Sequence, residues 1–318
     1  MSADLKISVI ICTHNPRSDY FDRTLDALRA QSLPGNQWEM LVVDNASKEP
    51  VQGCFDFSWH PNVRSVREEK LGLTPARLRG IAESGGDLLV FVDDDNVLDA
   101  DYLEKALHVA VERPFLGSWS GQCRPGFEQQ PDEWTRRYWG NLVIREFDKD
   151  VWSNLPRLGA TMPCGAGLCV RREVARHYLA VIQSGQRSIQ FDRTGTSLLS
   201  GGDNDLAACA CDIGLGVGLV SSLKLTHLIA PGRLTEDYLS RLAEGIAYSA
   251  VFLDRDRGIH DPPRGMLGRV ADSLRIALLH RPHKQIQRSA IRGRDNALRQ
   301  LETAAAFHAH SRTNLAEP

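Results

Sequence analysis

Three short apolar runs near the start of the chain each end in a cluster of polar residues, and this pattern constrains the fold most. The runs are Ile7–Cys12, Trp38–Val43 and Asp87–Val92, and their apolar, often branched side chains are typical of buried strands. Apolar residues at helical spacing occupy Tyr20–Gln31, and Thr74–Ser84 also has helical character. Strands that alternate with helices predict an α/β fold with a parallel, doubly wound sheet.

The polar residues that follow these runs are expected to meet at one edge of the sheet. They are residues 13–15, then Asp44 and Asn45, and then residues 93–95. Ligands of such sheets bind beyond the carboxyl ends of the strands. The sequence therefore predicts a binding crevice at this edge.

Asp93, Asp94 and Asp95 form the most informative of these clusters. Adjacent carboxylates repel one another, and the repulsion is costly unless a cation neutralises it. Mg²⁺ or Mn²⁺ suits this role, because both prefer oxygen ligands and substrate phosphates. The alternative interpretation is a solvated acidic turn or a helix cap that leads into residues 99–110.

Four further positions each have a functional and a structural interpretation. Asp44 could accept hydrogen bonds from a base or a ribose, or could form an Asx turn. Asp203, in the acidic turn 201–206, could be a general base or a helix cap. His227 could bind a metal or lie satisfied in the core. The glycines around Gly165 could admit a ligand or make a tight turn.

Charge and cysteine usage exclude some protein classes. Residues 251–318 hold 12 Lys or Arg against 7 Asp or Glu, although the chain has a formal net charge of −2. The basic character is therefore confined to the C-terminal part, and a nucleic-acid partner is not indicated. The seven cysteines form no CxxC pair, which indicates buried thiols in a reducing compartment. The N-terminus reads as neither a signal peptide nor a membrane span, so we expect a cytoplasmic protein.

The second half of the chain is less regular. Residues 115–165 combine tryptophans with Pro and Gly, which predicts loops and short strands. A strand is predicted at Val217–Leu228, and helices are predicted at Glu173–Gln183, Leu206–Cys211 and Leu234–Phe252.

Taken together, the motifs resemble the family 2 glycosyltransferases, whose fold is the Rossmann-like type-A glycosyltransferase domain. The matching segments are, in order, CTHNPRSDYFDRTLDALRAQ, LVVDNAS, EEKLGLTPARLRGIAES, FVDDDN, CGAGLCVRREV, LLSGGDNDLAACACDIG and LKLTHLIAPGRLTEDYLSRLAEG. The resemblance covers about residues 6–250. It implies a single α/β domain with a mixed, mostly parallel central sheet at residues 1–253, followed by a basic helical extension at residues 254–318. Residues 1–112 would be its nucleotide-binding half, and residues 113–253 its acceptor and catalytic half.

The resemblance also implies a role for each matching position. The nucleoside pocket would be lined by Thr13, Asn15, Asp44 and Arg77. The ribose and diphosphate would lie near Asp93 and Asp94, and Gly165 would line the donor site. The metal would be held by Asp95, with His227 as a second contact. The general base would be Asp203, with Asp205 as the fallback because Gly202 stands where the family often has Glu.

The implied activity is metal-dependent, inverting transfer of a sugar from a nucleoside-diphosphate-sugar to an acceptor hydroxyl. The donor would be linked to UDP or GDP, and the cofactor would be Mn²⁺ or Mg²⁺. The product would be a polysaccharide, glycolipid or other glycoconjugate. The acceptor, either a glycan or a lipid-linked molecule, is not defined by the sequence.

Three other functions fit parts of the pattern. Residues 93–97 also match the nucleophile motif of haloacid-dehalogenase-like phosphatases, with Asp93 as the nucleophile. That family places its nucleophile after the first strand of its domain, whereas two strand–helix units precede Asp93 here. A nucleotidyltransferase would need a basic, Gly-rich loop near the N-terminus, which residues 13–20 lack. A non-catalytic module that binds nucleotide-sugars predicts that Asp203 is dispensable.

The Arg-rich segment Met266–Leu301 has two interpretations of equal weight. One is a basic amphipathic surface in peripheral contact with anionic lipids on the cytoplasmic membrane face. The other is a helical extension that packs on the domain or forms a homodimer contact.

Overall fold

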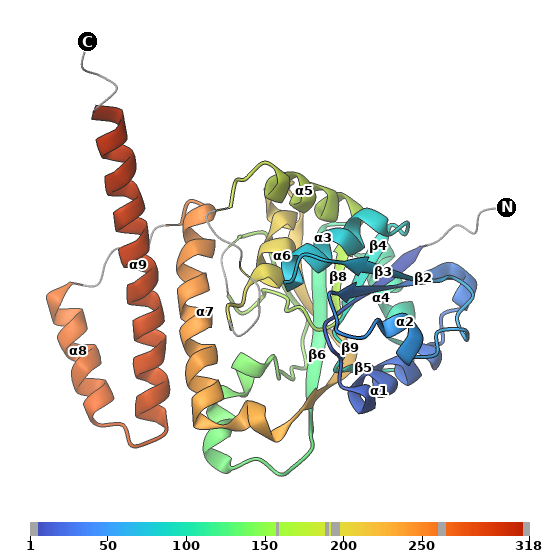
Figure 1. Cartoon of the computed structure of the whole chain (residues 1–318), viewed down its shortest axis with the longest axis horizontal. Helices are drawn as coiled ribbons and strands as arrows, with labels where there is room; N and C mark the ends of the chain where they lie inside the picture. The colour runs from blue at the N-terminus through green and yellow to red at the C-terminus, as the bar shows by residue number, and fades with distance from the viewer. Residues whose placement is uncertain (1–5, 157–158, 188–190, 192–197, 260–264, 314–318) are drawn as a thin grey trace.

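The computed structural model describes residues 6–156, 159–187, 191, 198–259 and 265–313. Four neighbouring strands, all parallel, form the N-terminal half of one large sheet (Figure 1). Their order across the sheet is β3 (Val63–Glu68), β2 (Trp38–Asn45), β1 (Ile7–Thr13) and β4 (Leu88–Val92). The predicted strands therefore exist, and their carboxyl ends lie side by side.

The second half of the sheet is mixed. It continues with β8 (Leu168–Arg171), β6 (Leu116–Phe127), β9 (Gly216–Ile229) and β5 (Asn96–Leu98), while β7 (Val151–Ser153) pairs with β9. Strand β8 runs antiparallel to both β4 and β6, and β9 runs parallel to β6. Within the described residues, six of the nine strands thus share one direction. The predicted α/β fold with a mixed, mostly parallel sheet is confirmed.

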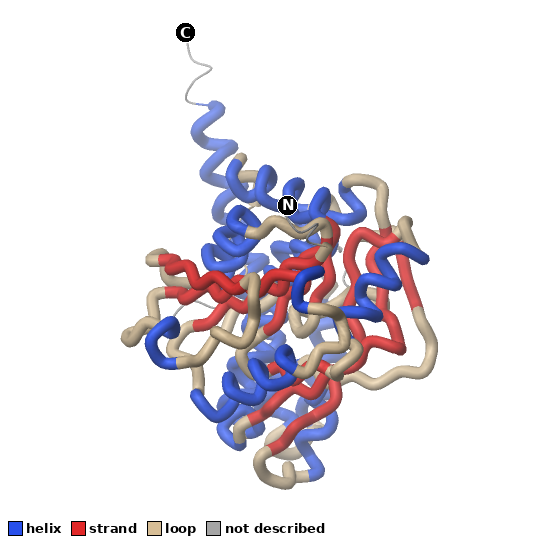
Figure 2. Tube along the Cα trace, turned by 90° about the vertical axis from the view of Figure 1, so that its right-hand side faces the viewer, coloured by secondary structure: helices blue, strands red, loops and turns tan. Residues whose placement is uncertain are grey.

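Helices cover both faces of the sheet, because alternate side chains of each central strand point to opposite faces (Figure 2). In β1, Ile7, Val9 and Ile11 join one buried cluster, whereas Ile10 joins the other. The first cluster includes α1 (Ser18–Arg29) and α4 (Tyr102–Glu112), and α2 (Val51–Cys54) and the 3-10 turn η1 (Gly35–Gln37) lie on the connections around β2. The second cluster includes α3 (Leu73–Glu83), α5 (Arg172–Gln183) and α6 (Gly202–Asp212).

The prediction of loops and short strands for residues 115–165 is wrong in its first part. Strand β6 has 12 residues, and a 3-10 segment, η2 (Glu133–Leu142), follows it. The glycines and serines in the sequence LGSWSGQCRPGF obscure the alternation that predicts a strand. One of them, Gly121, is required by packing. A Cβ atom at Gly121 would lie 2.2 Å from the carbonyl oxygen of Leu223 in β9.

The C-terminal part consists of a turn, η3 (Pro231–Leu234), and the helices α7 (Glu236–Asp256), α8 (Met266–Ala277) and α9 (His283–Thr313). Helix α9 lies along α7, and α8 lies on the outer side of α9 (Figure 1). The approach of α9 to α7 is close, because a Cβ atom at Gly293 would lie 2.1 Å from the carbonyl oxygen of Glu244. Among the described helices, none is both long enough and apolar enough to cross a bilayer.

Candidate functional site

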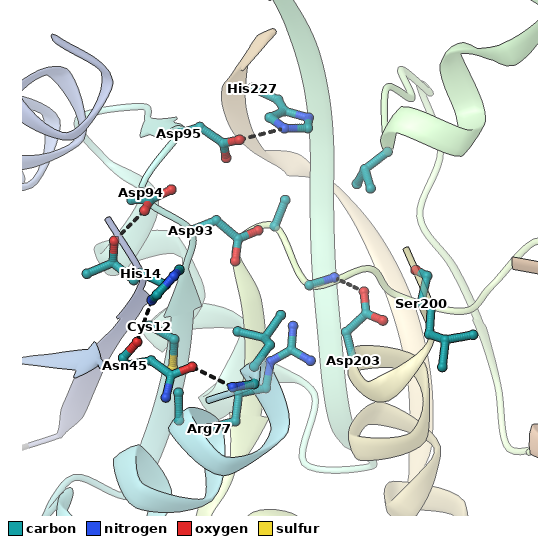
Figure 3. Close-up of a pocket in the computed structure, with 18 of the residues that line it drawn as sticks. Cys12, His14, Asn45, Arg77, Asp93, Asp94, Asp95, Ser200, Asp203 and His227 are labelled. Carbon is teal, nitrogen blue, oxygen red and sulfur yellow. Dashed lines mark hydrogen bonds and ion pairs between the residues drawn. The ribbon is translucent and has the colours of Figure 1, made fainter. Parts of the chain in front are cut away.

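A cleft of about 330 Å³ opens where the carboxyl ends of β1, β2 and β4 meet the start of α3 and the start of α6 (Figure 3). Most of its lining residues come from segments that are far apart in sequence. They are Cys12, Thr13, His14, Asn45, Leu71, Gly72, Leu73, Ala76, Arg77, Asp93, Asp94, Asp95, Val143, Gly165, Ala166, Leu199, Ser200, Asp203, His227 and Arg233. The predicted crevice at the strand ends is therefore present.

The aspartate cluster lies where the chain leaves the main sheet. Strand β4 ends at Val92, and β5 begins at Asn96, which pairs with His227 of β9. The fully buried Asn96 side chain donates to Asp95 Oδ1 at 2.8 Å and accepts from the Asp93 backbone N–H at 3.3 Å. The backbone N–H of Leu228 donates to the carbonyl oxygen of Asp95 at 2.8 Å. This pairing of β5 with β9 holds Asp95 beside His227.

Asp95, His227 and Arg233 form one polar cluster at this end of the cleft. His227 Nδ1 lies 3.0 Å from the carbonyl oxygen of Leu142, which can only accept, so Nδ1 carries the proton. His227 Nε2 therefore presents its lone pair to the cleft, 3.2 Å from Asp95 Oδ2. Arg233 bridges the two atoms, donating to Asp95 Oδ2 at 2.9 Å and to His227 Nε2 at 3.0 Å. Two acceptor atoms thus share one cation.

The same two atoms suit a divalent metal. A carboxylate oxygen and an imidazole nitrogen are ligands that Mn²⁺ accepts, and the Leu142 carbonyl orients the imidazole as an outer partner commonly does. The cleft as described supplies only two ligands at one point. No three of its carboxylate and imidazole groups bring one ligand atom each within 4.8 Å of one another. Phosphate oxygens and water would have to complete the coordination.

Asp93 and Asp94 lie beside this cluster and are costly to ionise. Burial and the charge of Asp95 raise the pKa of Asp94 to about 7, against a hydrogen bond from the Thr13 hydroxyl that lowers it. Burial and Asp95 also raise the pKa of Asp93, which the charge of Arg77 opposes. A cation bound in the cleft would lower both pKa values.

Asp203 lies in the first turn of α6 and faces the cleft from the opposite side (Figure 3). Its Oδ2 accepts from the backbone N–H of Gly165 at 2.6 Å, and its Oδ1 accepts from the N–H of Asn204 at 2.9 Å. A side chain at position 165 would be crowded, because its Cβ atom would lie 3.0 Å from Asp203 Oδ2 and 3.1 Å from the Arg77 guanidinium. The structure thus brings Asp203, Gly165 and Arg77 together, and Asp203 stays half-exposed.

Asp205, the fallback base, lies elsewhere. Its side chain is 1% exposed and is not part of the cleft lining. It is ion-paired with Arg187 and Arg257, each at 2.8 Å, and both guanidiniums are also buried. The structure therefore corrects the fallback, since Asp205 is fully engaged in a structural ion-pair network.

Asp44 and Asn15 support the cleft wall rather than line it. Asp44 accepts from the backbone N–H groups of Ser47 and Val51 and pairs with Arg67 at 3.0 Å, as the Asx-turn interpretation predicts. Asn15, in a left-handed conformation, contacts His14 Nε2 at 2.7 Å. The neighbours His14 and Asn45 line the cleft in their place.

The sequence interpretation missed several lining residues, of which Arg233 and Val143 are the most informative. Arg233 follows a turn-forming Pro-Gly pair, and nothing in the local pattern marks it as part of a site. Val143 adopts a φ of 66°, which is strained for a branched residue. Residues with such strained backbones are often found at functional sites. Neither feature is visible before the chain is folded.

Comparison with known proteins gives one family match and several relatives. The model of glycosyl transferase family 2 matches residues 8–179, which is more than half of the 318 residues. The putative teichuronic acid biosynthesis glycosyltransferase TuaG of Bacillus subtilis is 30% identical over 118 residues, or 36% of this chain and 46% of TuaG. A glucosyl-dolichyl phosphate glucuronosyltransferase of Haloferax volcanii is 25% identical over 131 residues, or 41% of this chain and 42% of that protein. The matched stretch thus spans less than half of either relative.

Solved structures show the same fold. TarS 1–349 of S. aureus in complex with UDP-GlcNAc superposes with a TM-score of 0.51 at 16% identity, covering 79% of this chain and 70% of that one. The UDP complex of the same protein gives a TM-score of 0.51 at 15% identity, covering 94% and 92%.

Proposed function

The chain belongs to glycosyl transferase family 2, and from this premise we propose that it transfers a sugar from a nucleoside-diphosphate donor to an acceptor hydroxyl. The observation that carries the proposal is the arrangement of the cleft. A half-exposed carboxylate, Asp203, faces a cation-binding cluster, Asp95 with His227, across one cavity. A transferase needs both, since one end must accept a proton and the other must stabilise a departing diphosphate.

The donor is proposed to bind with its nucleotide at the ends of β1 and β2. Thr13, His14, Asn45 and Arg77 line that part of the cleft. TarS has been solved with UDP and with UDP-GlcNAc, and its shared fold supports UDP as the first nucleotide to test, with GDP second.

Mn²⁺ or Mg²⁺ is proposed to be held by Asp95 and His227, next to Asp93 and Asp94. When bound, the metal would stabilise negative charge on the diphosphate. Arg233, which now donates to both ligands, can donate to a phosphate oxygen once the metal takes its place.

Asp203 is proposed to take the proton from the acceptor hydroxyl. The N–H groups of Gly165 and Asn204 fix its carboxylate without neutralising it. Attack from the Asp203 side, opposite the diphosphate, would invert the anomeric configuration.

The acceptor is proposed to be a glycan or a lipid-linked sugar. The names of two relatives support both options, since one concerns teichuronic acid biosynthesis and the other a glucosyl-dolichyl phosphate.

The test is a thermal-shift screen of UDP- and GDP-sugars, each with Mn²⁺ or with EDTA. We expect one donor to stabilise the protein with Mn²⁺ and to lose most of its effect in EDTA. The donor found in this way is then assayed for metal-dependent transfer or slow hydrolysis. If no donor shifts the melting temperature, or if a generic phosphomonoester is turned over without any nucleotide-sugar, the proposal is wrong.

A further inference from the structure

Helix α8 carries an apolar stripe that faces solvent. Met266 is 75% exposed, Leu267 87%, Leu274 64% and Leu278 82%, and Val270 is also exposed. Exposed apolar side chains are common when scattered singly, but a contiguous set marks an interaction surface. These five residues are called the α8 stripe below.

The stripe is one continuous face of the helix. Positions 266, 267, 270, 274 and 278 all fall within about 120° around the helix axis at 3.6 residues per turn. The opposite side of α8 packs on α9, where Ile276 is only 7% exposed. Figure 1 shows α8 at the outer edge of the molecule, with α9 between it and α7. The fold therefore covers one face of α8 and leaves the other exposed.

Basic groups flank the stripe at its C-terminal end. Arg275 and Arg281 are exposed, and neither forms an ion pair with any described residue. The Lys284 ammonium donates to the carbonyl oxygen of Ala277 at 3.2 Å, which places a third positive charge at the end of α8. Asp272 is the one acidic residue in the sequence of α8.

We infer that the α8 stripe docks on an anionic lipid surface, with α8 lying in the plane of the membrane interface. An apolar face flanked by Arg and Lys is the arrangement that inserts among acyl chains while the cations contact acidic headgroups. A second copy of the chain fits less well. One 12-residue helix face offers little area compared with the roughly 1,200–2,000 Å² that stable interfaces bury. The inference does not depend on the proposed function, because lipid binding is measured without substrates.

The experiment is vesicle co-sedimentation of the full chain with phosphatidylcholine vesicles that contain about one third phosphatidylglycerol, a composition with strong anionic surface charge. The test variant is Leu267→Gln/Leu274→Gln/Leu278→Gln. The matched control is Val111→Gln/Val151→Gln/Leu155→Gln, which also replaces three exposed apolar residues, but far from α8 in sequence. Melting temperatures of both variants show whether each is folded.

We expect the wild type and the control to sediment with the vesicles and the stripe variant to lose at least about tenfold in partitioning. Arg275→Gln/Arg281→Gln should weaken binding to anionic vesicles and make the binding less sensitive to salt, with Lys284 still contributing. Equal sedimentation of the stripe variant and the control, or no sedimentation of the wild type, would overturn the inference. The inference would also be overturned if vesicles bind neither protein and light scattering shows a wild-type dimer that the stripe variant abolishes.

Discussion

The two ends of the cleft hold carboxylates in opposite ways. Asp95 lies beside His227 and is paired with Arg233, so its charge is already shared with a cation. Asp203, on the facing wall, accepts from the backbone N–H groups of Gly165 and Asn204 and stays half-exposed. The first arrangement suits positive charge, and the second suits the base that we propose for an incoming hydroxyl. The contrast teaches that acidity alone does not assign a role, whereas the partners of each carboxylate do.

Asp203→Asn tests most directly whether the carboxylate on the facing wall acts as the base. The amide cannot accept the acceptor's proton, so we expect turnover to fall by about 10²- to 10⁴-fold. Donor affinity should not change, because Asp203 lies on the wall opposite the metal cluster. Initial rates with saturating donor, together with donor binding by calorimetry, check this. Retained turnover would assign the base to another group or make the protein a binding module.

Asp205→Asn tests whether the carboxylate two residues further on has only a structural role. It removes the carboxylate that pairs with the buried Arg187 and leaves the buried Arg257 with Asp212 alone, which should cost about 3–5 kcal/mol in the free energy of unfolding. Turnover of the folded fraction at low temperature should stay near the wild-type value. Urea unfolding measures the loss, and Asp237→Asn, at an exposed position, is the control. A stable but inactive variant would contradict the assignment.

Arg233→Ala should change how strongly the Asp95 end of the cleft binds a metal. The guanidinium competes with a metal for Asp95 and His227, so its removal should tighten Mn²⁺ binding without donor, on the order of tenfold. Calorimetric titration of Mn²⁺ measures the change. His227→Ala is the matched control and should weaken binding, because it removes a ligand rather than a competitor. If Arg233→Ala also weakens Mn²⁺ binding, Arg233 does not compete with the metal.

The smallest expected effect concerns the pH dependence of stability. The pKa of Asp94 is raised from its ordinary 3.8 to about 7, so the folded state holds this proton more tightly than the unfolded chain. The resulting destabilisation is absent below pH 3.8, grows as the pH rises, and is complete above pH 7.

Asp94→Asn removes that dependence. In EDTA we expect the variant to be more stable than the wild type at pH 8 by on the order of 1–2 kcal/mol. Solvent in the partly open cleft screens the charge of Asp94 and keeps this difference small. At pH 4.5 the difference should shrink. Thermal unfolding across this range gives the curve, with the exposed Asp22→Asn as the control. A gain in stability that is independent of pH would exclude titration of Asp94 as its cause.

Much of the donor side of the fold could be predicted from the sequence. The runs at Ile7–Cys12, Trp38–Val43 and Asp87–Val92 form strands whose polar ends meet, because a buried parallel strand leaves a local apolar pattern. Strand β6 was missed, because close packing against β9 requires Gly121, and glycine weakens the apolar alternation that predicts a strand. The domain boundary near residue 253 stays a prediction, and α7 runs past it to Asp256.

The sequence by itself determined which chemistry is present: three adjacent carboxylates after a buried strand and a second acidic turn before a helix. Only the tertiary structure decided where each group lies and which partners it meets. Asp203 and Asp205 belong to the same acidic turn in the sequence. Helical residues two positions apart lie about 200° apart around the axis, so one of them faces the cleft and the other the core. Likewise, Asp95 meets His227 and Arg233 only because β5 pairs with β9, and a local pattern carries no record of a contact made across more than 130 residues.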